Sequence, residues 1–242
     1  MRPRRLSLFP LLALCSLAVI EITSEPVFPQ DKPYPSPDRF ERAIRAFEKA
    51  DRTKPPPTGG IVCIGSSSMR KWHATIRKDL APLTVIPRGF GGSNMHDAFS
   101  FADRIVIRYK PRAIVLYEGD NDIAQGISPT KIRNTFLALV AKIHRPLPQT
   151  RIYVLAIKPS VRRWNLWPRM RQANRLLAEE CAKDKRLTYV DVAAVMLKKN
   201  GQVKTDIFES DNLHMNRKGY LLWKKVLRPT LLRRELRFEL QP

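Results

Sequence analysis

Residues 61–68 read IVCIGSSS, a run of four apolar residues followed by one glycine and three serines. Apolar runs of this length are typical of strands buried on both faces, as in a parallel sheet covered by helices. Four similar runs follow it, at Thr84–Ile86, Ala113–Tyr117, Ile152–Ile157 and Leu187–Val190. Helical patterns lie between and around the runs: one begins after Asn94, and others span Thr130–His144, Pro168–Asp184 and Asn216–Leu227. This alternation predicts a three-layer α/β/α sandwich with a five-stranded parallel sheet.

Functional residues of such a sheet are expected in the loops after the strands, at their carboxyl ends. Gly65-Ser66-Ser67-Ser68 is the first of these loops and predicts a tight turn from strand to helix. A serine in this position is exposed beside the backbone N–H groups of a helix start, which can stabilise an oxyanion. Taken alone, however, serines before a helix more often indicate ordinary capping.

Two further loops contain glycine and acidic residues. The loop RGFGGSN, residues 88–94, lets the backbone approach a ligand, but it lacks the glycine spacing of a dinucleotide or phosphate loop. The loop EGDND, residues 118–122, is compatible with a divalent metal, a phosphotransfer aspartate or a simple turn. It does not match a calcium loop, because Ile123 stands where that loop needs glycine. The amide of Asn121 could also donate a hydrogen bond to an oxyanion.

The fourth segment, Asp211-Asn212-Leu213-His214, precedes the last predicted helix. Histidine transfers protons near neutral pH, and a carboxylate three residues earlier can fix its tautomer. Of the other histidines, His73 and His144 fall in helical patterns and are predicted at the surface, whereas His96 is a weaker site candidate. An isolated Asp-x-x-His is more often a turn before a helix. Together, though, the four segments supply a nucleophile, oxyanion donors and an acid–base pair in order, as acyl transfer requires.

These segments resemble the blocks of the SGNH (GDSL-type) hydrolase family over roughly residues 60–230. Gly65-Ser66-Ser67 resembles the family's Gly-Asp-Ser, with Ser66 in place of the usual aspartate. Gly92 matches the glycine of the second block, Gly119–Asp122 matches Gly-x-Asn-Asp, and Asp211–His214 matches Asp-x-x-His.

The resemblance implies a flavodoxin-like fold and a serine esterase or lipase. It assigns catalysis to Ser67, Asp211 and His214, and the oxyanion hole to the Ser67 and Gly92 backbone N–H groups with the Asn121 side chain. It implies neither a metal nor another cofactor.

The substrate is suggested by the loop after the fourth predicted strand, which contains two arginines and two tryptophans. Trp164 and Trp167 could stack on a sugar ring while Arg162 and Arg163 hold an acidic group, which would suit deacylation of a glycan. The same residues could contact anionic headgroups, which would suit a lysophospholipid ester. Equally, the aromatic rings could only pack the loop onto the domain.

The chain of 242 residues has 44 Lys and Arg against 22 Asp and Glu, a formal net charge of +22. This charge favours anionic surroundings, including a membrane surface. It leaves open a basic module that binds an anionic polymer, although the cations form no recognised nucleic-acid motif and no nucleic-acid partner is expected. A phosphohydrolase that uses a metal at Asp120 and Asp122 is the other alternative. The composition does not indicate an oligomeric state.

The first 25 residues have three arginines and then an apolar run, Leu6–Ile20, shorter than a typical membrane span. They predict a signal peptide, or an uncleaved N-terminal anchor, and hence a periplasmic or secreted protein. We expect residues 26–58 to form a Pro-rich strap and a helix, the latter over residues 38–50, and residues 59–242 to form the hydrolase domain. Cys63 and Cys181 are predicted to be separate buried thiols.

Overall fold

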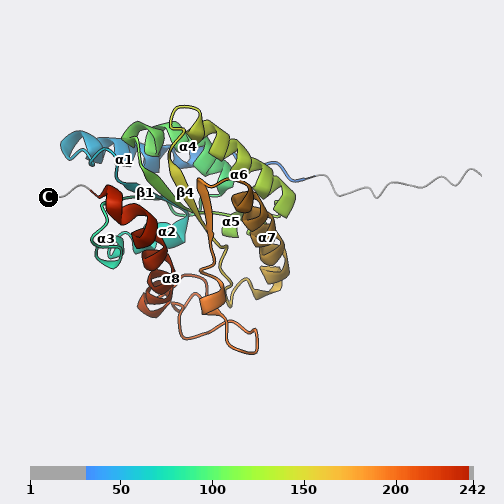
Figure 1. Ribbon diagram of the computed structural model, residues 1–242. Helices are drawn as coiled ribbons and strands as arrows, with labels where there is room; N and C mark the ends of the chain where they lie inside the picture. The colour runs from blue at the N-terminus through green and yellow to red at the C-terminus, as the bar shows by residue number, and fades with distance from the viewer. Residues whose placement is uncertain (1–30, 240–242) are drawn as a thin grey trace, which may run out of the picture. The chain divides into compact units, whose positions relative to one another are not determined.

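The computed structural model describes residues 31–239, which lie in one compact unit (Figure 1). The predicted export segment, residues 1–25, lies outside the described residues. Within the described part of the chain, no helix is both long enough and apolar enough to cross a membrane.

The sheet has five parallel strands, as predicted, and their order is β2-β1-β3-β4-β5. Their bounds are β1 Ile61–Gly65, β2 Val85–Gly89, β3 Ala113–Tyr117, β4 Arg151–Leu155 and β5 Leu187–Val190. β2 extends three residues beyond its predicted end, because the charged Arg88 is buried in it. Arg88 pairs with Asp51 at 2.5 Å and donates to the Tyr109 hydroxyl at 2.9 Å, which satisfies its charge inside the fold.

Helices cover both faces of the sheet (Figure 1). On one face, α1, α4, α6 and α7 pack side by side in that order, and on the other lie α2, α3 and α8. Their bounds are α1 Glu41–Thr53, α2 Ser67–Trp72, α3 Ile76–Asp79, α4 Met95–Ile105, α6 Pro129–His144, α7 Trp167–Lys183 and α8 Arg217–Glu235; the short α5, Asp120–Ala124, follows β3. Single 3₁₀ turns are η1 Pro37–Phe40, η2 Ile107–Tyr109, η3 Trp164–Leu166, η4 Ala194–Met196 and η5 Leu236–Phe238. The three-layer sandwich is confirmed.

The last helix, α8, is longer than predicted. The Asn216 side chain caps its start by accepting from two backbone N–H groups. The helix then continues past Pro229 to Glu235, although proline usually ends or kinks a helix. Burial explains the continuation: Leu231 is fully buried, and the buried Glu235 accepts from Arg151 at 2.5 Å and from the Tyr153 hydroxyl at 2.6 Å.

Two minor predictions have opposite outcomes. Cys63 and Cys181 are separate, buried and unbridged, as predicted. The surface placement of His144 was wrong: the ring is buried and its Nε2 lies 2.9 Å from the Thr150 carbonyl oxygen. His73, which was also predicted at the surface, is instead half-buried, and its Nε2 accepts from the Gly89 N–H at 2.9 Å. Burial and neighbouring arginines lower the pKa of His73 to about 4, so this ring is a neutral structural group.

The strand order fixes where a site can form. β1 and β3 are adjacent at the centre, but the chain leaves β1 towards β2 on one side and then continues from β3 to the other side. Loops therefore diverge at the carboxyl ends of β1 and β3, the switch point at which sheets of this kind usually bind ligands. Ser67 follows β1 and Asn121 follows β3, so both residues lie at this switch point.

Candidate active site

Ser67 stands at the start of α2, directly after a turn that only glycine can make without strain. Gly65 has φ +151°, and a Cβ there would lie 2.3 Å from the Tyr117 carbonyl oxygen. Ser67 is half-buried, whereas Ser66 and Ser68 are buried. The Ser67 N–H is at the first position of the helix, where a backbone donor has no acceptor within the helix.

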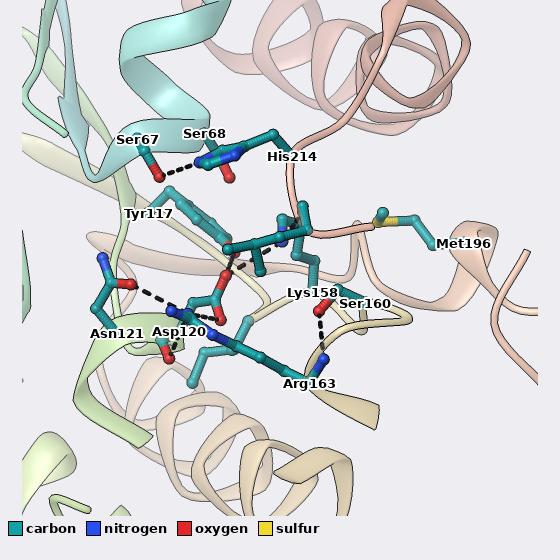
Figure 2. A network of polar contacts seen from close by, with 12 residues as sticks. Ser67, Ser68, Tyr117, Asp120, Asn121, Lys158, Ser160, Arg163, Met196 and His214 are labelled. Atoms are coloured by element: carbon teal, nitrogen blue, oxygen red, sulfur yellow. Dashed lines mark hydrogen bonds and ion pairs between the residues drawn. The ribbon is translucent and has the colours of Figure 1, made fainter. Parts of the chain in front are cut away.

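The structure brings Ser67, His214 and Asp211 into one hydrogen-bonded chain. Ser67 Oγ lies 2.8 Å from His214 Nε2 (Figure 2), and His214 Nδ1 lies 2.5 Å from Asp211 Oδ2. The other carboxylate oxygen, Asp211 Oδ1, accepts from the backbone N–H groups of Leu213 and His214, each at 2.9 Å. The carboxylate therefore orients both the ring and the backbone that carries it.

Electrostatics keep this carboxylate ionised. Partial burial raises the pKa of Asp211, but hydrogen bonds from the His214 ring and from the two backbone N–H groups lower it by more. The net pKa lies well below that of an ordinary aspartate. A proton shared between Asp211 and His214 consequently stays on the imidazole, which leaves Nε2 to accept a proton from Ser67.

Gly92 and Asn121 come from two different loops that contact each other. Gly92 has φ +89°, a conformation that favours glycine, in the turn before α4. Asn121 lies in the first turn of α5, and its Nδ2 donates to the Ser93 carbonyl oxygen at 2.8 Å. The amide that follows β3 is thus held against the loop that follows β2.

The two aspartates considered as metal ligands have other partners. Asp122 accepts from the Tyr34 hydroxyl, the Met95 N–H and the Gly119 N–H, each at about 3.0 Å in its shortest contact. Burial raises its pKa to about 6. Asp120 pairs with Lys158 and with Arg163. Across residues 31–239, no group of three or more His, Cys, Asp or Glu side chains is placed to hold a metal ion.

The predicted substrate loop is divided by the fold. Trp164 is 37% exposed and stacks on Trp167, which is 9% exposed and packs into the core, so only Trp164 presents its ring to solvent. Arg162 is exposed, and its backbone N–H donates to the Asn212 carbonyl at 3.0 Å. Arg163 differs most from the prediction, because its guanidinium contacts Asp120 and Asn121 (Figure 2).

Several residues at the site were not predicted. Lys158 is completely buried, and its Nζ donates to Asp120 Oδ2 at 3.1 Å and to the Leu213 carbonyl at 2.9 Å. A single buried lysine after a strand has no periodicity to distinguish it from a surface lysine. Its signal lies only in the apolar residues before it, which place it shortly after the end of β4 at Leu155.

The segment before β1 also reaches the site. Arg39 pairs with Asp97 at 2.5 Å, and Asp97 completes the cap of α4 with Asn94. The Phe40 ring packs edge-on against Phe90, and a side chain added at Gly92 would meet it at 3.7 Å. These contacts join residues that are distant in the sequence, so no local sequence pattern could predict them.

An α/β/α sandwich with these residues at its switch point defines the class of SGNH-type hydrolases. A family model described as the GDSL-like Lipase/Acylhydrolase family matches residues 59–222, more than half of the chain. The chain belongs to this family, and it is accordingly an enzyme that hydrolyses esters.

Solved structures with the same fold agree with this family. A Streptococcus pneumonia protein provisionally described as a platelet activating factor shares 20% identity at a TM-score of 0.69, over 80% of this chain and 93% of its own. A GDSL-like lipase from Bacteroides thetaiotaomicron shares 16% identity at a TM-score of 0.62, over 82% and 98%. A catalytic mutant of an acetylxylan esterase from Geobacillus stearothermophilus shares 16% identity at a TM-score of 0.56, over 73% and 94%. A search of curated proteins finds no match.

Proposed function

We propose that the enzyme hydrolyses carboxylic esters through a covalent acyl-enzyme formed on Ser67. The observation that carries this proposal is the continuous chain from Ser67 Oγ through the His214 ring to Asp211, with contacts of 2.8 and 2.5 Å. His214 accepts the serine proton as Oγ attacks the ester carbonyl carbon, and then donates it to the leaving alcohol. Water repeats the cycle on the acyl-enzyme and releases the acid.

Three donors stabilise the tetrahedral oxyanion in this mechanism: the Ser67 and Gly92 backbone N–H groups and Asn121 Nδ2. The support is that Ser67 begins α2 after β1, that Gly92 and Asn121 lie in the segments after the neighbouring strands β2 and β3, and that the hydrogen bond to Ser93 uses only one of the two Nδ2 hydrogens. A donor already fixed in place costs no reorganisation when the negative charge develops, which is why such sites accelerate acyl transfer.

Alanine variants at Ser66, Ser67 and Ser68 test the nucleophile. With p-nitrophenyl acetate, we expect Ser67→Ala to lower kcat by about 10⁴-fold or more, because both proton transfer and covalent attack are lost. A fluorophosphonate probe should label the native enzyme and not this variant. Ser66→Ala and Ser68→Ala are the matched controls and should keep both labelling and turnover. The proposal fails if Ser67→Ala is labelled and active while a neighbouring variant is inactive.

For the substrate, we propose a short acyl group on a glycan. Trp164 presents its ring to solvent on the loop after β4. The residue before it, Arg163, contacts Asn121, so a sugar stacked on the Trp164 ring would lie beside the site. A lipid-binding face would be a contiguous apolar patch. Among residues 31–239, the exposed large apolar side chains other than Trp164 are spread over α6, α8 and η5: Leu137, Leu221, Leu236 and Phe238.

Chain-length and alcohol preference test this substrate. Across p-nitrophenyl esters from acetate to decanoate, we expect kcat/KM to be highest for the shortest acyl groups. Trp164→Ala should raise KM for an acetylated oligosaccharide about 10-fold, since one stacked ring contributes roughly 1–1.5 kcal/mol. Its kcat/KM for ethyl acetate, which has no ring, should not change. An optimum at long acyl chains would instead indicate a lipid ester.

A further inference from the structure

Arg163 contacts the oxyanion amide itself. Its Nη1 donates to Asn121 Oδ1 at 3.0 Å, to Asp120 Oδ1 at 2.6 Å and to the Asp120 carbonyl at 3.1 Å (Figure 2). The side chain is 19% exposed, so the guanidinium is mostly enclosed. It reaches the amide from the loop after β4, and in Figure 2 Asp120 and Asn121 lie between it and Ser67.

An asparagine amide can take two orientations that differ in which atom faces the oxyanion. With Oδ1 towards the oxyanion, a negative oxygen would meet a lone pair instead of an N–H. The observed orientation is fixed at both ends, since Asn121 Oδ1 accepts from Arg163 and Nδ2 donates to the Ser93 carbonyl. Rotation of the amide by 180° would set a donor against the guanidinium and an acceptor against the carbonyl. Both contacts would become repulsive.

The guanidinium is itself held by a buried ion-pair cluster. Asp120 lies between Arg163 and the fully buried Lys158, and the Tyr117 hydroxyl donates to the same carboxylate at 3.3 Å. Burial raises the pKa of Asp120, but the two cations lower it by more, so the carboxylate stays ionised. The Arg163 backbone N–H also donates to the buried Ser160 Oγ at 3.2 Å. Arg163 therefore has few alternative positions.

We infer that Arg163 is a positioning residue for the oxyanion hole: it locks the Asn121 amide with Nδ2 towards the reacting carbonyl oxygen. The inference rests on the proposed function, because it assigns a role to Asn121 in stabilising the oxyanion. The cationic guanidinium on Oδ1 also withdraws electron density from the amide, which makes its N–H groups stronger donors. The two cations outweigh the single carboxylate of Asp120, so the cluster carries a net positive charge. This charge also stabilises the developing oxyanion.

A double-mutant cycle between Arg163 and Asn121 tests this role. We expect Arg163→Ala to lower kcat by about 10- to 100-fold with little change in KM, less than the roughly 100- to 1,000-fold for Asn121→Ala. In the Asn121→Ala background, Arg163→Ala should have no further effect on kcat, because the group it orients is absent. Methylguanidinium added to Arg163→Ala should restore part of kcat, and it should not help Asn121→Ala.

Controls separate this inference from its alternatives. Arg175→Ala removes an arginine whose side chain is 69% exposed on α7 and should leave kcat and KM unchanged. Arg163→Lys is the second variant of the cycle in case Arg163→Ala does not fold: it keeps the charge beside Asp120 without the planar fork, and it should also lose kcat only when Asn121 is present.

Losses that multiply in the double variant would overturn the inference, because Arg163 would then act independently of Asn121. A rise in KM with unchanged kcat would also overturn it and indicate that Arg163 binds the substrate. Failure of the proposed function gives a different result: Ser67→Ala would remain active or be labelled, and Asn121→Ala would not affect kcat.

Discussion

Asp211 makes two kinds of contact at the candidate active site, one to the His214 ring and two to backbone N–H groups. The first selects the tautomer with hydrogen on Nδ1, and the other two fix the turn on which the ring stands. Its low pKa means that this carboxylate remains ionised through the acid range in which an ordinary aspartate titrates. Orientation and charge therefore come from one residue.

Asp211→Asn separates these two contributions. The amide can still contact the ring, but its NH₂ group would favour the tautomer with hydrogen on Nε2, which cannot accept the serine proton. We expect kcat to fall by about 10²- to 10⁴-fold at neutral pH while the thermal midpoint changes little. Asp206 pairs with Lys218 on the surface in the same region. Asp206→Asn is therefore the control and should retain full activity. Equal activity of both variants would contradict the assignment of Asp211.

At the residue scale, the sequence predicted that Ser67, Asn121 and His214 lie in one candidate site, because each follows a predicted strand or precedes a predicted helix. Arg163 was predicted to face the substrate, and the structure directs its guanidinium to Asn121 and Asp120 instead. The residues next to an arginine in a loop do not indicate whether its guanidinium faces solvent or a buried carboxylate. Only the folded loop decides between these positions.

At the element scale, α3 and α8 are joined through one buried carboxylate. Asp79, at the end of α3, accepts from the Trp72 indole at 2.8 Å and from the Arg217 guanidinium at 2.5 and 2.6 Å. Its side chain is fully buried, whereas that of Arg217 is 46% exposed. Burial raises the pKa of Asp79, and hydrogen bonds from Arg217, Trp72 and Thr75 lower it by more, to about 2.

This pair should make the stability of the fold depend on pH. Because the folded pKa of about 2 is below the ordinary value of 3.8, the contribution is full above pH 3.8 and is lost as pH falls towards 2. We expect Asp79→Asn to lower the free energy of unfolding by about 3 kcal/mol at pH 7, the lower end for breaking a buried pair, since Arg217 regains water.

Urea unfolding of both proteins at several pH values measures this effect. The difference between the native protein and Asp79→Asn should shrink between pH 4 and pH 2, and a difference that stays constant would contradict the linkage. Asp103→Asn is the control, since that carboxylate is 64% exposed in its pair with Lys142 and should change stability by less than about 1 kcal/mol.

Apolar runs predicted the existence of every strand, but the predicted Ile152–Ile157 run extends two residues past the end of β4, at Leu155. β3 and β5 begin and end where their apolar runs do. β2 and α8 extend further than predicted, because Arg88 and Glu235 are charged residues that find partners inside the fold. Hydropathy counts such residues as surface, so it ends the element too early.

At the scale of the whole molecule, several acidic side chains are buried with arginine partners. Asp51, Asp79, Asp97, Asp120 and Glu235 are all buried, and each pairs with an arginine. Each of these five pairs is neutral, so the formal net charge of +22 comes from the other charged residues of the chain. The large positive charge is thus compatible with an enzyme fold that pairs these five buried carboxylates with arginines.

The stretch that matches the family begins at residue 59. Tyr34, Arg39 and Phe40 precede this stretch, yet they contact residues within it. The family match therefore begins later in this chain than the residues that contact the site. A recombination event that moved only the shared stretch into another gene would remove the Tyr34 hydroxyl from Asp122, the Arg39 guanidinium from Asp97 and the Phe40 ring from the Gly92 turn. Evolution could transfer this enzyme as a working module only by carrying its upstream segment along, or by replacing that segment with another that covers the same two loops.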